Sequence, residues 1–71
     1  MKKFTDRDRE IFTFIQDYYQ KNGFSPSIRE IGAGVYMSRT AVQRHLYKMV
    51  EIGYLTISPK TPRSIVLNIQ L

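Results

Sequence analysis

The sequence predicts a mainly α-helical fold with a small β-hairpin (α+β), in which three helices precede two strands. Two patterns lead to this prediction. Apolar residues recur at helical spacing in three segments, and each segment follows a serine or a threonine. After Gly53 the apolar residues alternate with polar ones, as in a strand with one buried face. The 71 residues are enough for one domain with a single hydrophobic core.

Composition excludes several classes of protein. The chain contains no cysteine, which excludes disulfides, thiolate metal sites and a cysteine nucleophile. With 42% hydrophobic and 13% aromatic residues, it has the apolar material for a compact core. No apolar run approaches the roughly 20 residues of a membrane span, and the first residues lack the apolar stretch of a signal peptide. We therefore expect a cytoplasmic protein with no membrane partner.

Positive charge is concentrated in the second half of the chain. The net charge is +5, and the sequence pI is near 9.8. Residues 1–34 carry six basic and five acidic side chains, whereas residues 35–71 carry five basic side chains and one acid, Glu51. This local excess of four positive charges is typical either of a protein with a polyanionic partner or of a solvated basic surface.

The first helix is predicted over residues 5–22. Thr5 is a typical N-cap, and Asp8 stands at the third helical position, where its carboxylate completes a short form of the capping box. Asn22 and Gly23 end the helix, since glycine readily takes the left-handed conformation of a helix C-terminus. The residues at helical spacing that are predicted to face the core are Ile11, Phe14, Ile15 and Tyr18.

The second helix is predicted to be short, over residues 28–35. A connector that contains a proline precedes it, and Ser27 and Glu30 then have the spacing of a complete capping box. Gly32 and Gly34 weaken the helix intrinsically, so packing must hold it. Its predicted buried residues are Ile28, Ile31 and Val35.

The third helix is predicted over residues 39–52. Ser38 is its candidate N-cap, and Gly53 ends it. The residues at helical spacing on its core-facing side are Val42, Leu46, Met49 and Val50.

Two strands are predicted over residues 54–58 and 64–70. The connecting loop, residues 59–63, contains two prolines, which cannot donate ladder hydrogen bonds, and two basic residues. The order is therefore helix, helix, tight turn, helix, strand, basic loop, strand. This order is that of a winged helix-turn-helix, in which the hairpin forms the wing.

The outer side of the third helix is the main candidate for function. Its side chains are rich in hydrogen-bond donors, and arginine and glutamine can bind guanine and adenine respectively with two hydrogen bonds. The first turn carries no acid, although the helix dipole would favour one there. The alternative is an ordinary solvated helix surface. These outer residues are Arg39, Thr40, Gln43, Arg44, Tyr47 and Lys48.

The wing loop supplies two further basic residues, Lys60 and Arg63. We predict that they meet phosphates or a minor groove, and the alternative is that they serve solubility. His45, at the edge of the core, is predicted to pack between helices rather than to bind a ligand. The sequence has no nucleophile and base pair, metal constellation or glycine-rich phosphate loop. We therefore expect no enzyme, no metal, no cofactor and no small-molecule ligand.

Three segments resemble the N-terminal DNA-binding domain of LexA repressors, namely residues 24–32 (FSPSIREIG), 42–46 (VQRHL) and 60–65 (KTPRSI). The resemblance covers nearly the whole chain. It implies a winged-helix domain whose third helix enters the major groove of a palindromic operator. By position, the DNA contacts of that helix fall on Ser38, Thr40, Ala41, Gln43 and Arg44, and Ser27 at the start of the second helix is a further candidate.

The sequence departs from the LexA pattern in three ways. The turn before the third helix is one residue shorter, and Tyr36 stands where a glycine usually supplies the left-handed conformation. The outer face of the third helix differs, so the operator sequence of the relatives does not transfer. The self-cleaving C-terminal domain of these repressors, with its serine and lysine pair, has no counterpart in the 71 residues.

These patterns predict sequence-specific binding of double-stranded DNA by a transcriptional regulator, most readily a repressor. One module makes a modest contact with DNA, so useful specificity calls for two copies on two half-sites. Either the domain forms a homodimer, with residues 64–71 as a candidate interface, or the chain is a fragment of a longer regulator. The alternative is a winged-helix module that binds a protein and no DNA. An exposed aromatic patch formed by Phe12, Tyr19 or Tyr54 would favour that alternative.

Overall fold

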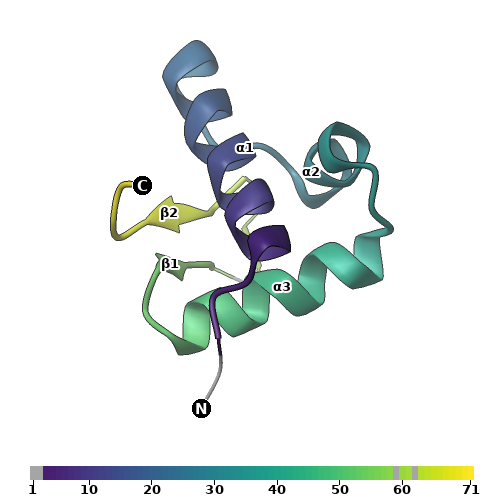
Figure 1. The fold of residues 1–71 in the computed structure, drawn as a ribbon. Coiled ribbons are helices and arrows are strands. Elements are labelled where there is room, and N and C mark those ends of the chain that lie inside the picture. Colours follow the sequence, from purple (N-terminus) through teal and green to yellow (C-terminus); the bar gives the residue numbers. More distant parts are fainter. Residues whose placement is uncertain (1–2, 59, 62) are drawn as a thin grey trace.

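The computed structural model describes residues 3–58, 60–61 and 63–71. Its elements within these ranges are the helices α1 (Asp6–Asn22), α2 (Ile28–Val35) and α3 (Arg39–Glu51) and the strands β1 (Leu55–Thr56) and β2 (Val66–Leu67). Figure 1 shows α3 lying across the lower end of α1, with α2 on one side of α1 and the hairpin on the other. The arrangement is the predicted winged helix-turn-helix, because three helices precede an antiparallel two-stranded wing.

All three predicted N-caps are confirmed. The Thr5 hydroxyl accepts a hydrogen bond from the Asp8 N–H, and the Asp8 carboxylate accepts one from the Thr5 N–H at 2.8 Å. Ser27 and Glu30 form the same reciprocal pair at the start of α2. The Ser38 hydroxyl accepts from the backbone N–H three residues further on, at 3.1 Å. These side chains satisfy backbone donors that a helix start leaves free, so each helix begins where a cap is encoded.

The turn between α2 and α3 depends on a left-handed residue that is not glycine. Tyr36 ends α2 with φ 58° and ψ 50°, and its side chain is 91% exposed. The following N–H, of Met37, donates to the Gly32 carbonyl at 2.9 Å. Tyr36 therefore takes the conformation that a glycine usually supplies, at a cost of about 1 kcal/mol.

Two glycines let α1 and the turn approach α2 closely. A Cβ atom at Gly34 would lie 2.1 Å from a ring carbon of Phe14, and one at Gly32 would lie 2.7 Å from the Met37 carbonyl oxygen. These separations are too short for any side chain. The predicted dependence of α2 on packing is consistent with these contacts, since the glycines that weaken the helix also let its neighbours pack against its backbone.

The core lies where the three helices and the base of the wing meet. The prediction that Val50 faces the core is wrong, since Val50 is 39% exposed on the wing side of α3. Phe12 is fully buried, packing near Phe4 and Tyr54, so it forms no part of an exposed aromatic patch that would favour the protein-binding alternative. The buried apolar residues are Ile11, Phe12, Ile15, Ile31, Val35, Val42, Leu46, Met49, Leu55 and Ile65.

The wing strands are much shorter than predicted. Each has two residues, and they pair antiparallel with Leu55 opposite Leu67. Side chains replace ladder bonds on both sides of this pairing. The Ser64 hydroxyl accepts from the Ser58 N–H and donates to the Ser58 carbonyl, while the Asn68 amide donates to the Gly53 carbonyl. Parts of the predicted loop, residues 59 and 62, lie outside the described residues.

Candidate nucleic-acid interface

The outer face of α3 carries unpaired polar groups. Arg39, Thr40 and Arg44 are exposed, and Gln43 is half-buried beside them. Among the residues that the structure describes, none of these four side chains makes a hydrogen bond or an ion pair. The first turn of α3 has no acid, so the positive end of the helix dipole adds to these charges. This face therefore offers donors and positive charge to a ligand.

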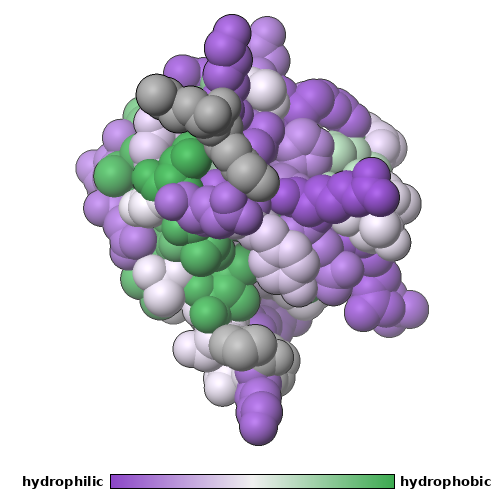
Figure 2. Space-filling model, turned by 90° about the horizontal axis from the view of Figure 1, so that it is seen from below, coloured by the Kyte–Doolittle hydropathy of each residue, from purple (hydrophilic) through white to green (hydrophobic). Residues whose placement is uncertain are grey.

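A crevice of about 590 Å³ lies between the start of α2, α3 and the wing. Its apolar lining includes Val50 and Ile57. Because α3 is the lowest helix in Figure 1, the view from below in Figure 2 looks onto this side, where apolar surface gathers beside a larger hydrophilic area. The predicted site residues that line the crevice are Ser27, Arg39, Gln43, Lys60 and Arg63.

Two of the predicted site residues are helix caps, and a third, Ala41, is apolar. The Ser27 and Ser38 hydroxyls cap α2 and α3, although Ser38 remains exposed and Ser27 half-exposed. Ala41 is half-buried on the first turn of α3, so its methyl group contributes shape rather than hydrogen bonds to the outer face. These residues lie beside the outer face of α3 without supplying charge to it.

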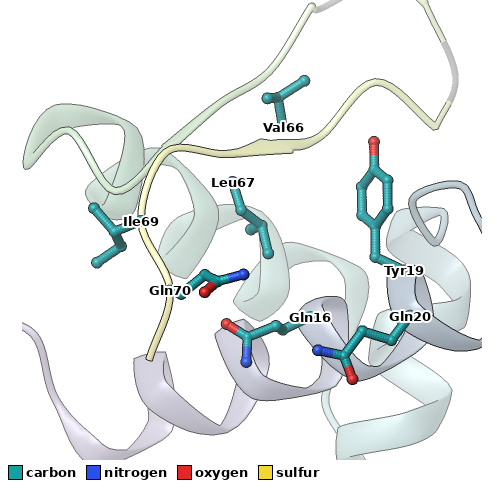
Figure 3. Close-up of a pocket in the computed structure, with 7 residues that line it drawn as sticks. All are labelled: Gln16, Tyr19, Gln20, Val66, Leu67, Ile69 and Gln70. Atoms are coloured by element: carbon teal, nitrogen blue, oxygen red, sulfur yellow. The ribbon is translucent and has the colours of Figure 1, made fainter.

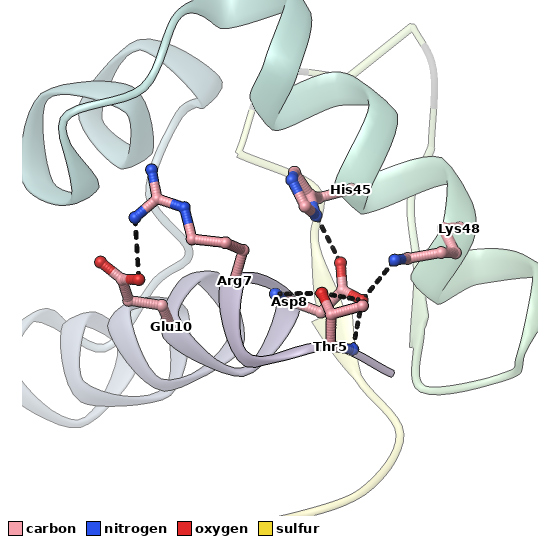
Figure 4. Close-up of polar contacts among 6 residues, drawn as sticks. All are labelled: Thr5, Arg7, Asp8, Glu10, His45 and Lys48. Carbon is pink, nitrogen blue, oxygen red and sulfur yellow. Dashed lines mark hydrogen bonds and ion pairs between the residues drawn. The ribbon is translucent and has the colours of Figure 1, made fainter. Parts of the chain in front are cut away.

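Lys48 turns away from the outer face and pairs with Asp8. Its Nζ lies 2.6 Å from Asp8 Oδ2, and the Asp8 side chain is fully buried. His45 Nδ1 lies 2.5 Å from the other carboxylate oxygen, so both α3 side chains converge on the first turn of α1 (Figure 4). We therefore assign Lys48 to the contact between α1 and α3 rather than to the DNA-facing surface. The predicted packing role of His45 is confirmed.

The hydrogen bonds around Asp8 keep its carboxylate ionised. Burial raises the pKa of this carboxyl group, but hydrogen bonds from Lys48, Thr5 and His45 outweigh burial and hold the pKa below its ordinary value. An ionised, fully paired carboxylate at this place links the start of α1 to the middle of α3. The orientation of the candidate reading helix thus depends on a charge outside that helix.

Arg63 also has partners within the molecule. Its guanidinium lies 2.7 Å from Glu30 Oε1 and donates to the Ser25 carbonyl and to the Tyr18 hydroxyl, each at 3.2 Å. The same group lies over the Phe24 ring, 5.1 Å from its centroid. Arg63 thus joins the base of the wing to α1 and α2, and the free cation of the wing loop among the described residues is Lys60.

Glu30 is the acidic partner in this second cluster. A hydrogen bond from the Ser27 backbone and then the pairing with Arg63 lower the pKa of Glu30 to about 2. Sequence analysis identified Asp8 and Glu30 only as capping residues. Their position in capping boxes was visible, but their partners lie 40 and 33 residues away in the sequence, which no local pattern reveals.

Other kinds of site find no support in the described residues. Within 3–58, 60–61 and 63–71, no group of three or more His, Cys, Asp or Glu side chains could hold a metal ion. In the same part of the chain no helix is long and apolar enough to cross a membrane.

Comparison with known proteins assigns the family. The family model described as the LexA DNA binding domain matches residues 1–64. The chain belongs to this family. It is 39% identical over 67 residues to LexA repressors of Thermosipho melanesiensis and Thermosipho africanus, covering 94% of this chain and 34% of each relative. The LexA repressor of Staphylococcus aureus strain Mu3 is 39% identical over 66 residues, 92% of this chain and 32% of the relative.

The comparison thus places the chain among LexA-type DNA-binding domains. The chain spans about a third of the length of the relatives that it matches. The matched residues include all of α3 and, in the wing, Lys60 and Arg63.

Proposed function

We propose that this domain binds double-stranded DNA in a sequence-specific manner and represses transcription, with α3 in the major groove. The observation that carries the proposal is the outer face of α3, where Arg39, Gln43 and Arg44 have no partner within the described part of the chain. Such side chains distinguish bases by hydrogen bonds to the edges that the major groove exposes.

Lys60 and the crevice beside α3 support a second contact, with the DNA backbone. Lys60 is exposed on the wing, on the opposite wall of the crevice from Arg39 and Gln43. The DNA backbone that borders the major groove would pass between these walls, where lysine and arginine neutralise phosphates regardless of sequence. In this proposal α3 supplies specificity and the wing supplies affinity.

We also infer that two copies act together on one operator. A single module of this kind buries only about 600–1,000 Å² on DNA, which limits its specificity. The outer edge of β2 is unpaired in the described residues, and Val66 is 52% exposed. Figure 3 shows Leu67 pointing towards α1 and Val66 pointing to the other side, beside a hollow of about 410 Å³. A second copy pairing along β2 would cover this edge.

Selection of binding sites from random duplex DNA tests the function. Specific binding predicts an enriched motif, and a two-fold complex predicts two half-sites separated by about 10 base pairs or a multiple of this spacing. Titration with unselected duplex at equal salt gives the control. Equal affinity for selected and unselected duplexes would contradict sequence-specific binding. No affinity for any duplex at low salt would favour the protein-binding alternative.

Sedimentation with the selected duplex measures how many domains bind one duplex, and so tests whether two copies pair along β2. Val66→Lys is expected to reduce the complex from two domains per duplex to one, because a charge at the β2 edge opposes pairing. Thr13→Lys adds the same charge at an exposed position on α1 and serves as the control. If Val66→Lys and Thr13→Lys give complexes of the same mass, β2 is not the interface.

A further inference from the structure

We propose that Glu30 is a positioning residue for DNA binding, because it holds the wing at a fixed place relative to the reading face of α3. The inference rests on the proposed function, since it concerns how the wing meets DNA. It assigns to Glu30 a role beyond its capping box. Three observations support it: the contacts of the carboxylate, the anchoring of Arg63, and the position of Lys60 beyond that anchor.

The Glu30 carboxylate joins three parts of the molecule. Its Oε1 accepts from the Ser27 N–H at 2.8 Å and lies 2.7 Å from the Arg63 guanidinium. Its Oε2 accepts from the Tyr18 hydroxyl at 3.0 Å. The start of α2, the second half of α1 and the base of the wing therefore meet at one side chain. Charge-assisted hydrogen bonds of this length hold a fixed geometry better than neutral ones.

Arg63 is anchored by more than the ion pair. Its backbone takes a left-handed conformation with φ 54°, which non-glycine residues adopt only when surrounding contacts enforce it. Its guanidinium contacts the Ser25 carbonyl and the Phe24 ring as well as Glu30. On its C-terminal side, Ser64 bonds twice to Ser58 and closes the base of the wing. The end of the wing that faces the helices is thus fixed.

Lys60 is exposed between Ser58 and Ser64, whose hydrogen bonds close the base of the wing. Thr61 N–H donates to the Ser58 carbonyl at 3.2 Å, so the described part of the tip is a turn built on the closed base. A lysine gains affinity from a phosphate only at close range, because solvent and salt screen the interaction beyond about 10 Å. If Arg63 loses Glu30, the wing base loses its charged anchor, and the position of Lys60 across the crevice from Arg39 and Gln43 becomes less constrained.

A double-mutant cycle on the selected duplex tests this positioning role. Glu30→Gln retains an oxygen acceptor for the Ser27 N–H but removes the charge that holds Arg63. We expect it to weaken binding by about tenfold, although it removes a negative charge, and to lower the salt slope by about one. The Lys60→Ala loss should become much smaller in the Glu30→Gln background, since both changes remove the same contact.

Glu10→Gln is the matched control. Glu10 is an exposed acid on α1 whose partner is Arg7, at 2.9 Å, so the substitution changes the net charge equally and leaves the wing alone. We expect its affinity to equal or exceed that of the wild type. All affinities are compared at a temperature where thermal unfolding shows each variant fully folded. A merely structural role of Glu30 would not make its effect depend on Lys60.

Several outcomes would overturn the inference. Additive losses from Glu30→Gln and Lys60→Ala, or equal affinities of Glu30→Gln and Glu10→Gln, would each do so. If Glu30→Gln does not fold, Arg63→Gln breaks the same pair with the capping box intact, and the same non-additivity with Lys60→Ala is expected. Absence of duplex binding by the wild type would overturn the proposed function as well, whereas wild-type binding with additive losses would overturn the positioning role alone.

Discussion

Tyr36 shows how one residue determines the presentation of α3. A left-handed conformation is required where α2 ends and the chain turns, and Tyr36 supplies it with φ 58° while exposing nearly its whole side chain. The helix-turn-helix geometry therefore accommodates a side chain at a position where glycine is easiest. The strain belongs to the backbone and not to contacts of the ring, so it can be relieved without loss of packing.

Tyr36→Gly is expected to stabilise the domain by about 1 kcal/mol, because glycine adopts the left-handed conformation without steric cost. In a domain of this size the midpoint of thermal unfolding should rise by roughly 4–8 °C. Tyr36→Ala removes the same exposed ring but keeps a Cβ atom, so its midpoint should stay near the wild-type value. An equal rise in both variants would mean that the ring, and not the backbone, is unfavourable.

At the scale of single residues, the helix caps could be predicted from the sequence and several burial assignments could not. Ser27, with Glu30 three positions later, signals a helix start locally, and the structure has the helix there. The apolar stripe predicts neither the burial of Phe12 nor the exposure of Val50, because a narrow stripe does not show how far the packing surface extends around a helix. That extent depends on where the other helices and the wing lie.

At the scale of elements, each of two capping boxes also holds a basic residue from the second half of the chain. Asp8 receives Lys48 from α3, and Glu30 receives Arg63 from the wing. The local sequence predicts the caps, but the pairs depend on the tertiary fold. Both basic residues had been counted as candidate DNA contacts, because a sequence does not reveal which cations are neutralised internally.

Asp8→Asn is expected to destabilise the domain by about 2 kcal/mol, since it leaves Lys48 without its buried counter-charge and His45 without the carboxylate that it contacts. Denaturant unfolding measures the change. Glu10→Gln breaks an exposed ion pair with Arg7 and should change the unfolding free energy by less than about 0.5 kcal/mol. Similar losses of unfolding free energy in both variants would show that the buried Asp8 contacts stabilise the domain no more than the exposed Glu10 pair does.

The stability of the fold should also depend on pH through Glu30. Its pKa is lowered from the ordinary value of 4.5 to about 2 in the folded domain, so its ionised form favours folding. This stability is complete above pH 4.5 and is lost as the pH falls towards about 2. Glu30→Gln has no such titration, and its unfolding free energy should fall less steeply over that range. If the unfolding free energies of the wild type and of Glu30→Gln fall equally over this pH range, the lowered pKa does not belong to Glu30.

At the scale of the whole molecule, the reading helix and the wing are separately tied to the N-terminal half. Asp8 fixes α3, Glu30 fixes the wing, and the crevice of about 590 Å³ lies between the two elements. The fold class and the order of elements could be predicted because periodicity and caps are local. The extent of the strands could not, since Ser64 and Asn68 replace ladder bonds with side-chain hydrogen bonds.

The central claim is that α3 reads bases while the wing holds the backbone. It is tested most directly by the affinities of Arg44→Ala and Lys60→Ala for the selected duplex and its single-base variants over a range of salt. Arg44→Ala should weaken the selected duplex by about tenfold or more and relax preference at one base pair, because an arginine that binds a base discriminates by about 1–3 kcal/mol. Lys60→Ala should weaken all duplexes alike and lower the salt slope by about one. Equal losses on every duplex from both substitutions would contradict base reading by α3.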